Sequence, residues 1–186
     1  MLTPQEQQFL LNLARQTIEH YLNTGKIVDI DKATLPSPRL LQKQGTFVTL
    51  HTNQGDLRGC IGNLEGTDEL YKDIVHNAFG AAFHDPRFLP VELDELPQIQ
   101  IEISLLTPPQ PLPYQNTADL LNKITPGRDG LILKKDGHTA TFLPQVWEEL
   151  NDKQDFLTHL SQKAGLSSDA WRDAEFFRYQ VEKFSE

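Results

Sequence analysis

The chain has 186 residues, of which 38% are hydrophobic and 23% charged, and its net charge at pH 7 is −9, a composition typical of a globular protein that buries a core. The negative charge disfavours nonspecific nucleic-acid binding, which needs lysines and arginines to displace counterions from phosphates. No apolar run reaches the roughly 20 residues that span a bilayer, and the N-terminus lacks the basic region of a signal peptide. A single cysteine cannot form an intrachain disulfide. We therefore expect a cytoplasmic protein without a membrane segment.

The first element is predicted to be a helix with a well-defined start. Thr3 fits the N-cap position, Pro4 the first helical position, and Glu6 completes a capping box. Apolar residues then recur at helical spacing until Asn23-Thr24-Gly25 ends the helix. Residues 26–44 follow as a loop with one short helix.

A β-hairpin is predicted over residues 47–62, where two segments of alternating apolar residues meet at a turn centred on Gln54-Gly55. In that register the opposite pairs are Asn53 and Asp56, His51 and Arg58, and Thr49 and Cys60. Because successive side chains of a strand point to opposite faces, the hairpin has one buried face and one polar face. The buried face is expected to hold Val48, Leu50, Leu57 and Ile61, and the polar face Thr49, His51, Arg58 and Cys60.

A second helix is expected from about Asp68 to Phe83, capped by Thr67. Its small residues Gly80-Ala81-Ala82 would allow a close approach to a sheet or another helix, and the proline of His84-Asp85-Pro86 ends it. The clearest strand of the chain follows at residues 98–105, where isoleucines and Leu105 alternate with polar residues.

Four prolines between Thr107 and Pro113 predict a stiff connector and a boundary between two lobes. The smaller lobe, residues 109–166, is expected to contain several helices and a hairpin that turns at Asp136-Gly137. A last strand over 176–184 returns the chain to the larger lobe, which comprises about 1–108 and 167–186. The predicted class is α+β with antiparallel pairing and a cleft between the lobes.

Cys60 has two interpretations. As a functional residue it is a nucleophile or a metal ligand, because the cation Arg58 two residues away would stabilise a thiolate and His51 would be a diagonal neighbour. As a structural residue it is a small buried side chain, which is common for free cysteine. The flanking glycines Gly59 and Gly62 favour a site slightly, since glycine in a strand often marks a bulge or a close backbone approach.

Three charged residues are further candidates. Arg58 would be an anion clamp, a partner of a carboxylate or a solvated charge, and Arg87 would bind a ligand or pair with Asp85 and brace its loop. Glu102 would pair with Arg58 or act as a base only if its face of the sheet is the one that carries Cys60. The six histidines form no metal-binding pattern, and no nucleotide-binding, hydrolase or iron–sulfur motif is present, so no metal or cofactor is predicted.

Leu57-Arg58-Gly59-Cys60-Ile61-Gly62 resembles the signature hexapeptide of the AMME chromosomal region protein family (the AMMECR-type domain), whose prokaryotic members are called AmmeMemoRadiSam system protein A. Five further blocks occur in the same order as in that family. They are Asp85-Pro86-Arg87-Phe88, Ile101 to Pro108, Gly127 to Leu131, Leu143 to Val146, and Lys163 to Leu166. The resemblance spans nearly the whole chain.

The resemblance implies a two-lobed α+β fold, with a larger lobe built from both termini and an inserted lobe with a three-stranded sheet. It also implies that the signature side chains face the cleft, and that the protein shares a pathway with a Memo-type protein and a radical S-adenosylmethionine enzyme. The leading hypothesis is therefore a protein that binds a substrate, peptide segment or partner there. The binding residues would be Arg58, Gly59, Gly62, Asn63, Arg87 and Glu102, with Cys60 as the candidate catalytic residue.

The alternative hypothesis is a cysteine-dependent enzyme, in which Cys60 is the nucleophile and Arg58 holds the thiolate or a substrate anion. The absence of a second catalytic group beside Cys60 in the sequence favours binding over catalysis. Nucleic-acid and membrane partners are not expected.

Overall fold

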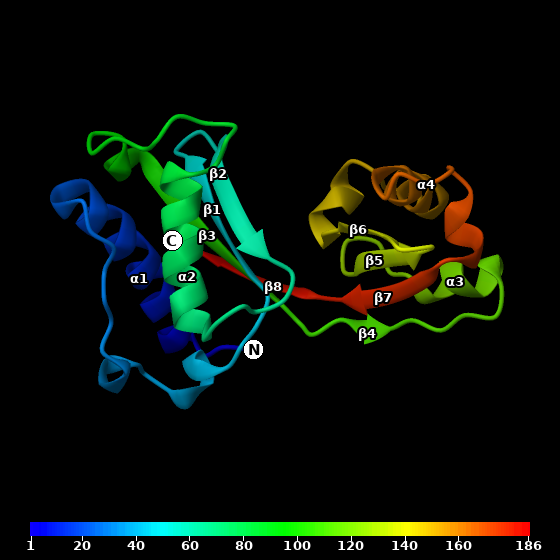
Figure 1. The fold of residues 1–186 in the computed structure, drawn as a ribbon, viewed down its shortest axis with the longest axis horizontal. Coiled ribbons are helices and arrows are strands. Elements are labelled where there is room, and N and C mark those ends of the chain that lie inside the picture. Colours follow the sequence, from blue (N-terminus) through cyan, green and yellow to red (C-terminus); the bar gives the residue numbers. More distant parts are fainter. The chain divides into compact units, whose positions relative to one another are not determined.

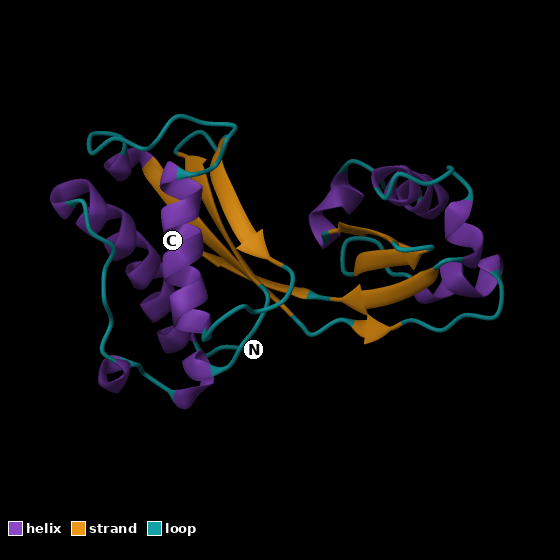
Figure 2. Cartoon of the chain, viewed as in Figure 1, coloured by secondary structure: helices purple, strands orange, loops and turns teal.

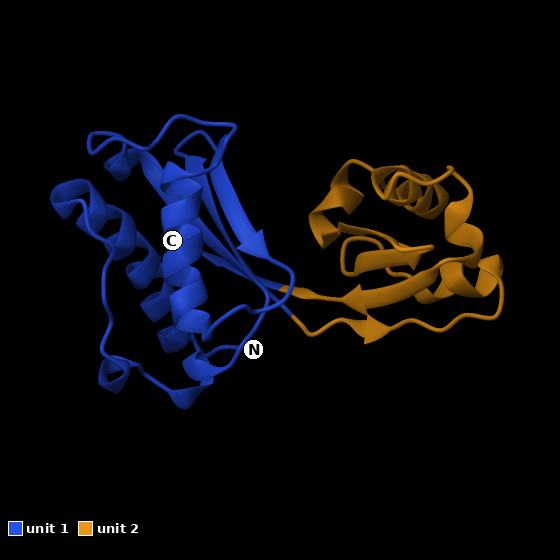
Figure 3. Cartoon of the chain, viewed as in Figure 1, with its two compact units in different colours: residues 1–106, 182–186 blue, residues 107–181 orange.

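The computed structural model describes residues 1–186, and the chain divides into two compact units (Figure 3). Unit 1 comprises Met1–Leu106 and Glu182–Glu186, and unit 2 comprises Thr107–Val181. The class is α+β, with helices and two antiparallel sheets (Figure 2). No helix of the structure is both long enough and apolar enough to cross a membrane.

Unit 1 contains the long helices α1 (Pro4–Thr24) and α2 (Leu70–Phe83). The predicted start of α1 is confirmed, because the Thr3 hydroxyl accepts from the Glu6 amide while the Glu6 carboxylate accepts from the Thr3 amide. Gly25 ends this helix in the left-handed conformation at φ 69°. Helix α2 begins two residues later than predicted, since Thr67 bonds to the carboxylate of Asp73 and Glu69 occupies the N-cap position. Three short 3₁₀ helices complete this unit: η1 (Lys32–Thr34), η2 (Pro38–Leu41) and η3 (Leu96–Gln98).

The sheet of unit 1 has four strands in the order β2-β1-β3-β8. Their bounds are β1 (Thr46–Thr52), β2 (Leu57–Asn63), β3 (Ile99–Leu106) and β8 (Val181–Ser185). Helix α2 packs on β1 and β2, and α1 packs on α2 and β3, so both helices cover the same face (Figure 1). Val48, Leu50, Ile101 and Ile103 are fully buried in this core, as the alternating apolar pattern of both strands predicts.

The predicted pairing of Thr49 with Cys60 is confirmed, but the register near the turn differs. The turn contains one residue more than expected, because Thr52 donates to the Asp56 carbonyl and Gly55 donates to the Thr52 carbonyl, each at 2.9 Å, which leaves the three residues 53–55 in the turn. A β-bulge between Leu50 and His51 then restores the register, so that His51 lies opposite Leu57 rather than Arg58.

Two predictions for this hairpin are therefore wrong. Asn53 does not face Asp56, and Arg58 does not face His51, because the extra residue of the bulge falls at Arg58. The bulge also changes the surroundings of Leu57, which was expected in the core but is 40% exposed.

Unit 2 is built around the sheet β4-β7-β5-β6, with helices α3 and α4. Its predicted hairpin turns as expected at Asp136-Gly137, where both residues have positive φ, as a type I′ turn requires. In its core the ring of Trp147 stacks on that of Phe156 with centroids 3.6 Å apart. The elements of unit 2 are β4 (Gln110–Pro111), α3 (Thr117–Lys123), β5 (Gly130–Lys135), β6 (His138–Phe142), η4 (Pro144–Glu148), α4 (Lys153–Lys163), η5 (Ala170–Asp173) and β7 (Glu175–Tyr179).

The single strand expected over residues 176–184 is two strands that belong to different sheets. Strand β7 pairs with β4 and β5 in unit 2, and β8 joins the sheet of unit 1 beyond Gln180. The sheet of unit 2 therefore has four strands rather than three. Residues 167–181 lie with unit 2, whereas the sequence placed them with the larger lobe.

Candidate functional site

Cys60 lies at the middle of β2, which is an edge strand of the sheet in unit 1. Its side chain is half-buried, and Thr49, directly opposite on β1, donates its hydroxyl to Cys60 Sγ at 3.3 Å. Both side chains are on the face of the sheet opposite Val48 and Leu50, which pack under the helices. The prediction that Cys60 and Thr49 share the face away from the core is confirmed.

The backbone of Cys60 is held by an ion pair from the loop after α2. The Cys60 amide donates to the Asp85 carboxylate at 2.9 Å, and Arg87 Nη2 donates to the Cys60 carbonyl at 3.4 Å. Asp85 and Arg87 bind each other through Arg87 Nε at 2.9 Å and Nη2 at 2.7 Å. We call this arrangement the Asp85–Arg87 clamp. It satisfies the amide and the carbonyl of Cys60, and unpaired backbone groups of an edge strand otherwise remain open to pairing with another chain.

The clamp is electrostatically well matched. Asp85 is 5% exposed, and the Arg87 guanidinium beside it, together with the Cys60 amide, holds the pKa of that carboxyl well below its usual range. The same ion pair raises the pKa of Arg87. Pairing of Arg87 with Asp85 to brace the loop, one of the two roles considered from the sequence, is thus what the structure shows.

Arg58 is also engaged with a carboxylate, that of Glu95. Its Nε and Nη2 donate to the two Glu95 oxygens at 3.0 Å each, which is the bidentate geometry favoured between guanidinium and carboxylate. The guanidinium also lies near the ring of Phe88, with its central carbon 5.9 Å from the ring centroid. Arg58 lowers the pKa of Glu95, and its side chain is only 14% exposed. Its charge is therefore paired with that of Glu95.

Glu102 is on the same face as Cys60, because Thr49 lies between them as the cross-strand partner of both. Glu102 does not reach Arg58, however. It pairs instead with Lys183 of β8 at 2.9 Å. Cys60, Thr49, Glu102 and Lys183 thus form a polar row across the four strands, which we call the polar row.

The remaining signature residues shape the backbone. A Cβ at Gly59 would lie 2.1 Å from the Ala81 carbonyl oxygen, so this glycine lets α2 approach β2 closely, as the small residues of the helix predict. A Cβ at Gly62 would lie 2.4 Å from the Phe47 ring. Gly59 is buried, whereas Asn63 is exposed at the end of β2.

Sequence patterns indicated Asp85 only as a possible partner of Arg87, and they indicated neither Glu95 nor Lys183 as a site residue. The Asp85-Pro86-Arg87 run contained the signal for Asp85, but Glu95 is 37 residues from Arg58 and no spacing rule joins them. His84, close in sequence, packs its ring against Phe79 at 4.8 Å. No group of three histidine, cysteine, aspartate or glutamate side chains is arranged to hold a metal ion.

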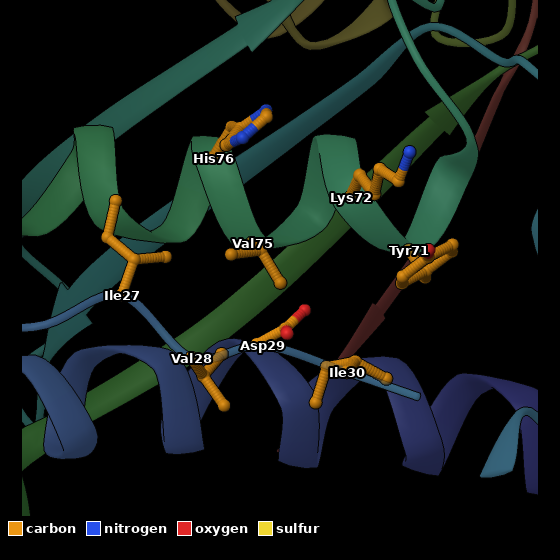
Figure 4. A pocket seen from close by; sticks show the side chains of 8 residues that line it. All are labelled: Ile27, Val28, Asp29, Ile30, Tyr71, Lys72, Val75 and His76. Atoms are coloured by element: carbon orange, nitrogen blue, oxygen red, sulfur yellow. The ribbon is translucent and has the colours of Figure 1, made fainter. Parts of the chain in front are cut away.

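A pocket of unit 1 lies away from these residues, between α2 and the loop at 27–30 (Figure 4). Its walls are mostly apolar, and the ammonium of Lys72 at its rim pairs with Asp68 and Glu69. The lining residues are Ile27, Val28, Asp29, Ile30, Tyr71, Lys72, Val75 and His76. None of them belongs to the clamp or the polar row.

Comparison with known proteins shows the family of the chain. The model of the AMMECR1 family matches residues 11–184. The chain belongs to the AMMECR1 family. Relatives of this family member include Protein MK0488 of Methanopyrus kandleri, 42% identical over all of this chain and 90% of that protein, and Protein MJ0810 of Methanocaldococcus jannaschii, 39% identical over all of this chain and 92% of that protein.

The AMMECR1 fold is also known from a solved structure. The crystal structure described as Uncharacterized Protein PH0010 from Pyrococcus horikoshii matches with a TM-score of 0.85 and 38% identity, covering all of this chain and 93% of that one. The family resemblance drawn from the six sequence blocks is therefore confirmed, as is the α+β class.

Proposed function

We propose that this AMMECR1-family protein is a binding component that presents the surface around Arg58 and Cys60 to a partner. We further propose that it acts in a pathway with a Memo-type protein and a radical S-adenosylmethionine enzyme, as the family resemblance implies. The pathway part of the proposal depends on the resemblance, and the binding part depends on the site itself.

One observation carries the binding part: the charged groups nearest to Cys60 are already engaged. Arg58 is bound by Glu95 and Arg87 by Asp85, so the charge of each guanidinium is shared with a carboxylate, and neither forms a hydrogen bond with the sulfur. The side-chain hydrogen bond at Cys60 Sγ comes from a threonine hydroxyl, which is not a general base at neutral pH. A cysteine nucleophile normally has a base or an undivided positive charge beside it. The arrangement is instead that of a braced edge strand with a half-buried thiol on its face.

Binding is tested by isothermal titration calorimetry with the two purified pathway proteins from the same organism. Each of them is titrated against three samples: wild-type protein, Cys60→Ser, and wild-type protein alkylated at Cys60 with a bulky maleimide. We expect wild-type and Cys60→Ser to bind one of the two partners with the same affinity, because serine keeps the shape of the surface. The bulky adduct is expected to abolish that binding by obstruction. No binding to either protein would refute the pathway, and unchanged binding by the adduct would refute the location.

The enzyme alternative has a separate test, the rate of alkylation of Cys60 by iodoacetamide near neutral pH. We expect the folded protein to react no faster than a short unstructured cysteine peptide. A markedly faster reaction, together with loss of cellular function in Cys60→Ser, would support Cys60 as a nucleophile and contradict the binding proposal.

A further inference from the structure

The loop between α2 and β3, residues 84–98, exposes large apolar side chains beside the clamp. Leu89 is 83% exposed and Leu93 is 53% exposed, and Leu57 at the start of β2 is 40% exposed. The ion pair between Arg58 and Glu95 joins the start of β2 to this loop, and Figure 1 shows the loop passing the β1–β2 turn at one end of unit 1. Single exposed leucines are ordinary on a surface. Leu57 adjoins Arg58, however, and Leu93 is two residues before Glu95, so the ion pair joins the two segments of backbone that carry exposed leucines and makes them a candidate contact region. We call Leu57, Leu89 and Leu93 the leucine surface.

Contacts at both ends and in the middle anchor this loop, so its leucines are exposed although the loop is well anchored. Asp85 anchors its beginning to Cys60, and Glu95 anchors its end to Arg58. Between these anchors Val91 is 2% exposed, and its amide donates to the Ala82 carbonyl at 2.9 Å. Prolines at positions 86, 90 and 97 reduce the conformational freedom of the loop further. A surface that is ordered before binding pays less entropy when it binds.

The charges beside these leucines are acidic and uncompensated. Glu92 and Asp94 flank Leu93, both are exposed, and neither forms an ion pair in the structure, whereas Asp85 and Glu95 are each neutralised by an arginine. Asp56, next to Leu57, is also exposed and without an ion pair. Negative charge around an apolar centre favours a partner with positive charge at matching positions and repels anionic surfaces.

We propose that the leucine surface is a protein-docking surface for a partner segment that presents apolar side chains flanked by lysines or arginines. The leucines supply the apolar contact, Glu92, Asp94 and Asp56 supply the complementary charge, and the anchored loop supplies a preformed shape. The proposal does not depend on the pathway or on Cys60. Such a docking surface is consistent with the proposed function of this AMMECR1 protein as a binding component.

The test uses a fluorescent synthetic peptide with two leucines one helical turn apart, flanked by lysines, and follows its anisotropy with the full chain at low and high salt. We expect saturable binding that Leu89→Ser/Leu93→Ser weakens at least about tenfold, as a contact centre should. Glu92→Gln/Asp94→Asn is expected to weaken binding and reduce its salt dependence. Leu41→Ser is the matched control, because Leu41 is also exposed, at 38%, but lies in η2.

Equal affinity of wild-type protein and Leu89→Ser/Leu93→Ser for the peptide would overturn the proposal, as would equal weakening by Leu41→Ser. The single variant Leu89→Lys keeps the test valid if the double variant is unstable, since this side chain is almost fully exposed and the added charge should repel the peptide. A concentration-dependent dimer in sedimentation experiments that disappears in Leu89→Ser/Leu93→Ser would assign the surface to a second copy of the chain and contradict a basic partner.

Discussion

Substitution of Asp85 tests whether the clamp holds the signature strand. In Asp85→Ala the carboxylate no longer accepts from the amides of Cys60 and Arg87 or from the Arg87 guanidinium. Hydrogen bonds to a charged group contribute about 1.5–3 kcal/mol each. Those from the guanidinium count for less, because the Arg87 side chain is 54% exposed and becomes hydrated when released. We therefore expect a loss of about 2–4 kcal/mol of unfolding free energy, most of it from the two amides.

Urea unfolding followed by circular dichroism measures this loss, with Asp85→Asn as the control. The asparagine side chain retains an oxygen that accepts from the Cys60 amide but has no charge for Arg87, so we expect a loss of about 1–2 kcal/mol. Hydrogen exchange at the Cys60 amide should accelerate in Asp85→Ala and much less in Asp85→Asn. If both variants unfold within about 0.5 kcal/mol of the wild type, the clamp does not stabilise the strand and the reasoning fails.

The clamp also has a pH signature whose sign follows from the lowered pKa of Asp85. A carboxyl whose pKa is lower in the folded than in the unfolded state contributes stability above its unfolded pKa of about 4. That contribution is lost as the pH falls below this value toward the folded pKa. As the pH falls below about 4, the unfolding free energy of wild-type protein should therefore decrease more steeply than that of Asp85→Asn. Parallel pH profiles would contradict a lowered pKa of Asp85 in the folded protein.

Three further outcomes follow from the structure. Gly59→Ala should destabilise the protein by about 3 kcal/mol in urea unfolding, because its Cβ would meet the Ala81 carbonyl oxygen at 2.1 Å, whereas Cys60→Ala should cost much less. Glu95→Gln should cost about 1–3 kcal/mol by leaving the buried Arg58 guanidinium without its carboxylate, and an unchanged melting temperature would refute this. Burial raises the pKa of Tyr179 to about 12, so stability should fall as the pH rises from about 10, the unfolded value, toward 12. The alkaline fall should be smaller in Tyr179→Phe, which also loses the bond to Thr141 at 2.9 Å and about 1 kcal/mol.

Structural features that depend only on residues close together in the sequence were predicted well. The capping box at Thr3 and Glu6, the alternation along β3 and the turn at Asp136-Gly137 each depend on residues within one turn or one strand. The shared face of Cys60 and Thr49 followed from the same alternation, whereas only the pairing of β3 with β1 showed that Glu102 lies on that face too. The Asp85–Arg87 pair was within reach too, because the two residues are neighbours across one proline.

Other features could not be read from the pattern because they depend on partners distant in sequence. The bulge at Arg58 accompanies a turn one residue longer than expected, and either turn is compatible with the residues present. Arg58 had several possible carboxylate partners, and only the path of the loop after α2 brings Glu95 to it. The sequence pattern allows Glu102 to pair with Arg58, but the fourth strand of the sheet supplies Lys183 instead.

The sequence by itself determined the family, the class, the start and end of α1 and the face on which Cys60 lies, since these depend on local propensity, side-chain periodicity and the order of six short blocks. Only the tertiary structure decided what surrounds Cys60. It also divided residues 175–185 between two sheets, although the apolar pattern over 176–184 is typical of one continuous strand. The physical reason is that β propensity specifies an extended backbone but not its hydrogen-bonding partner, and the ion pairs that hold β2 form only when strand and loop have been brought together by the packing of α2.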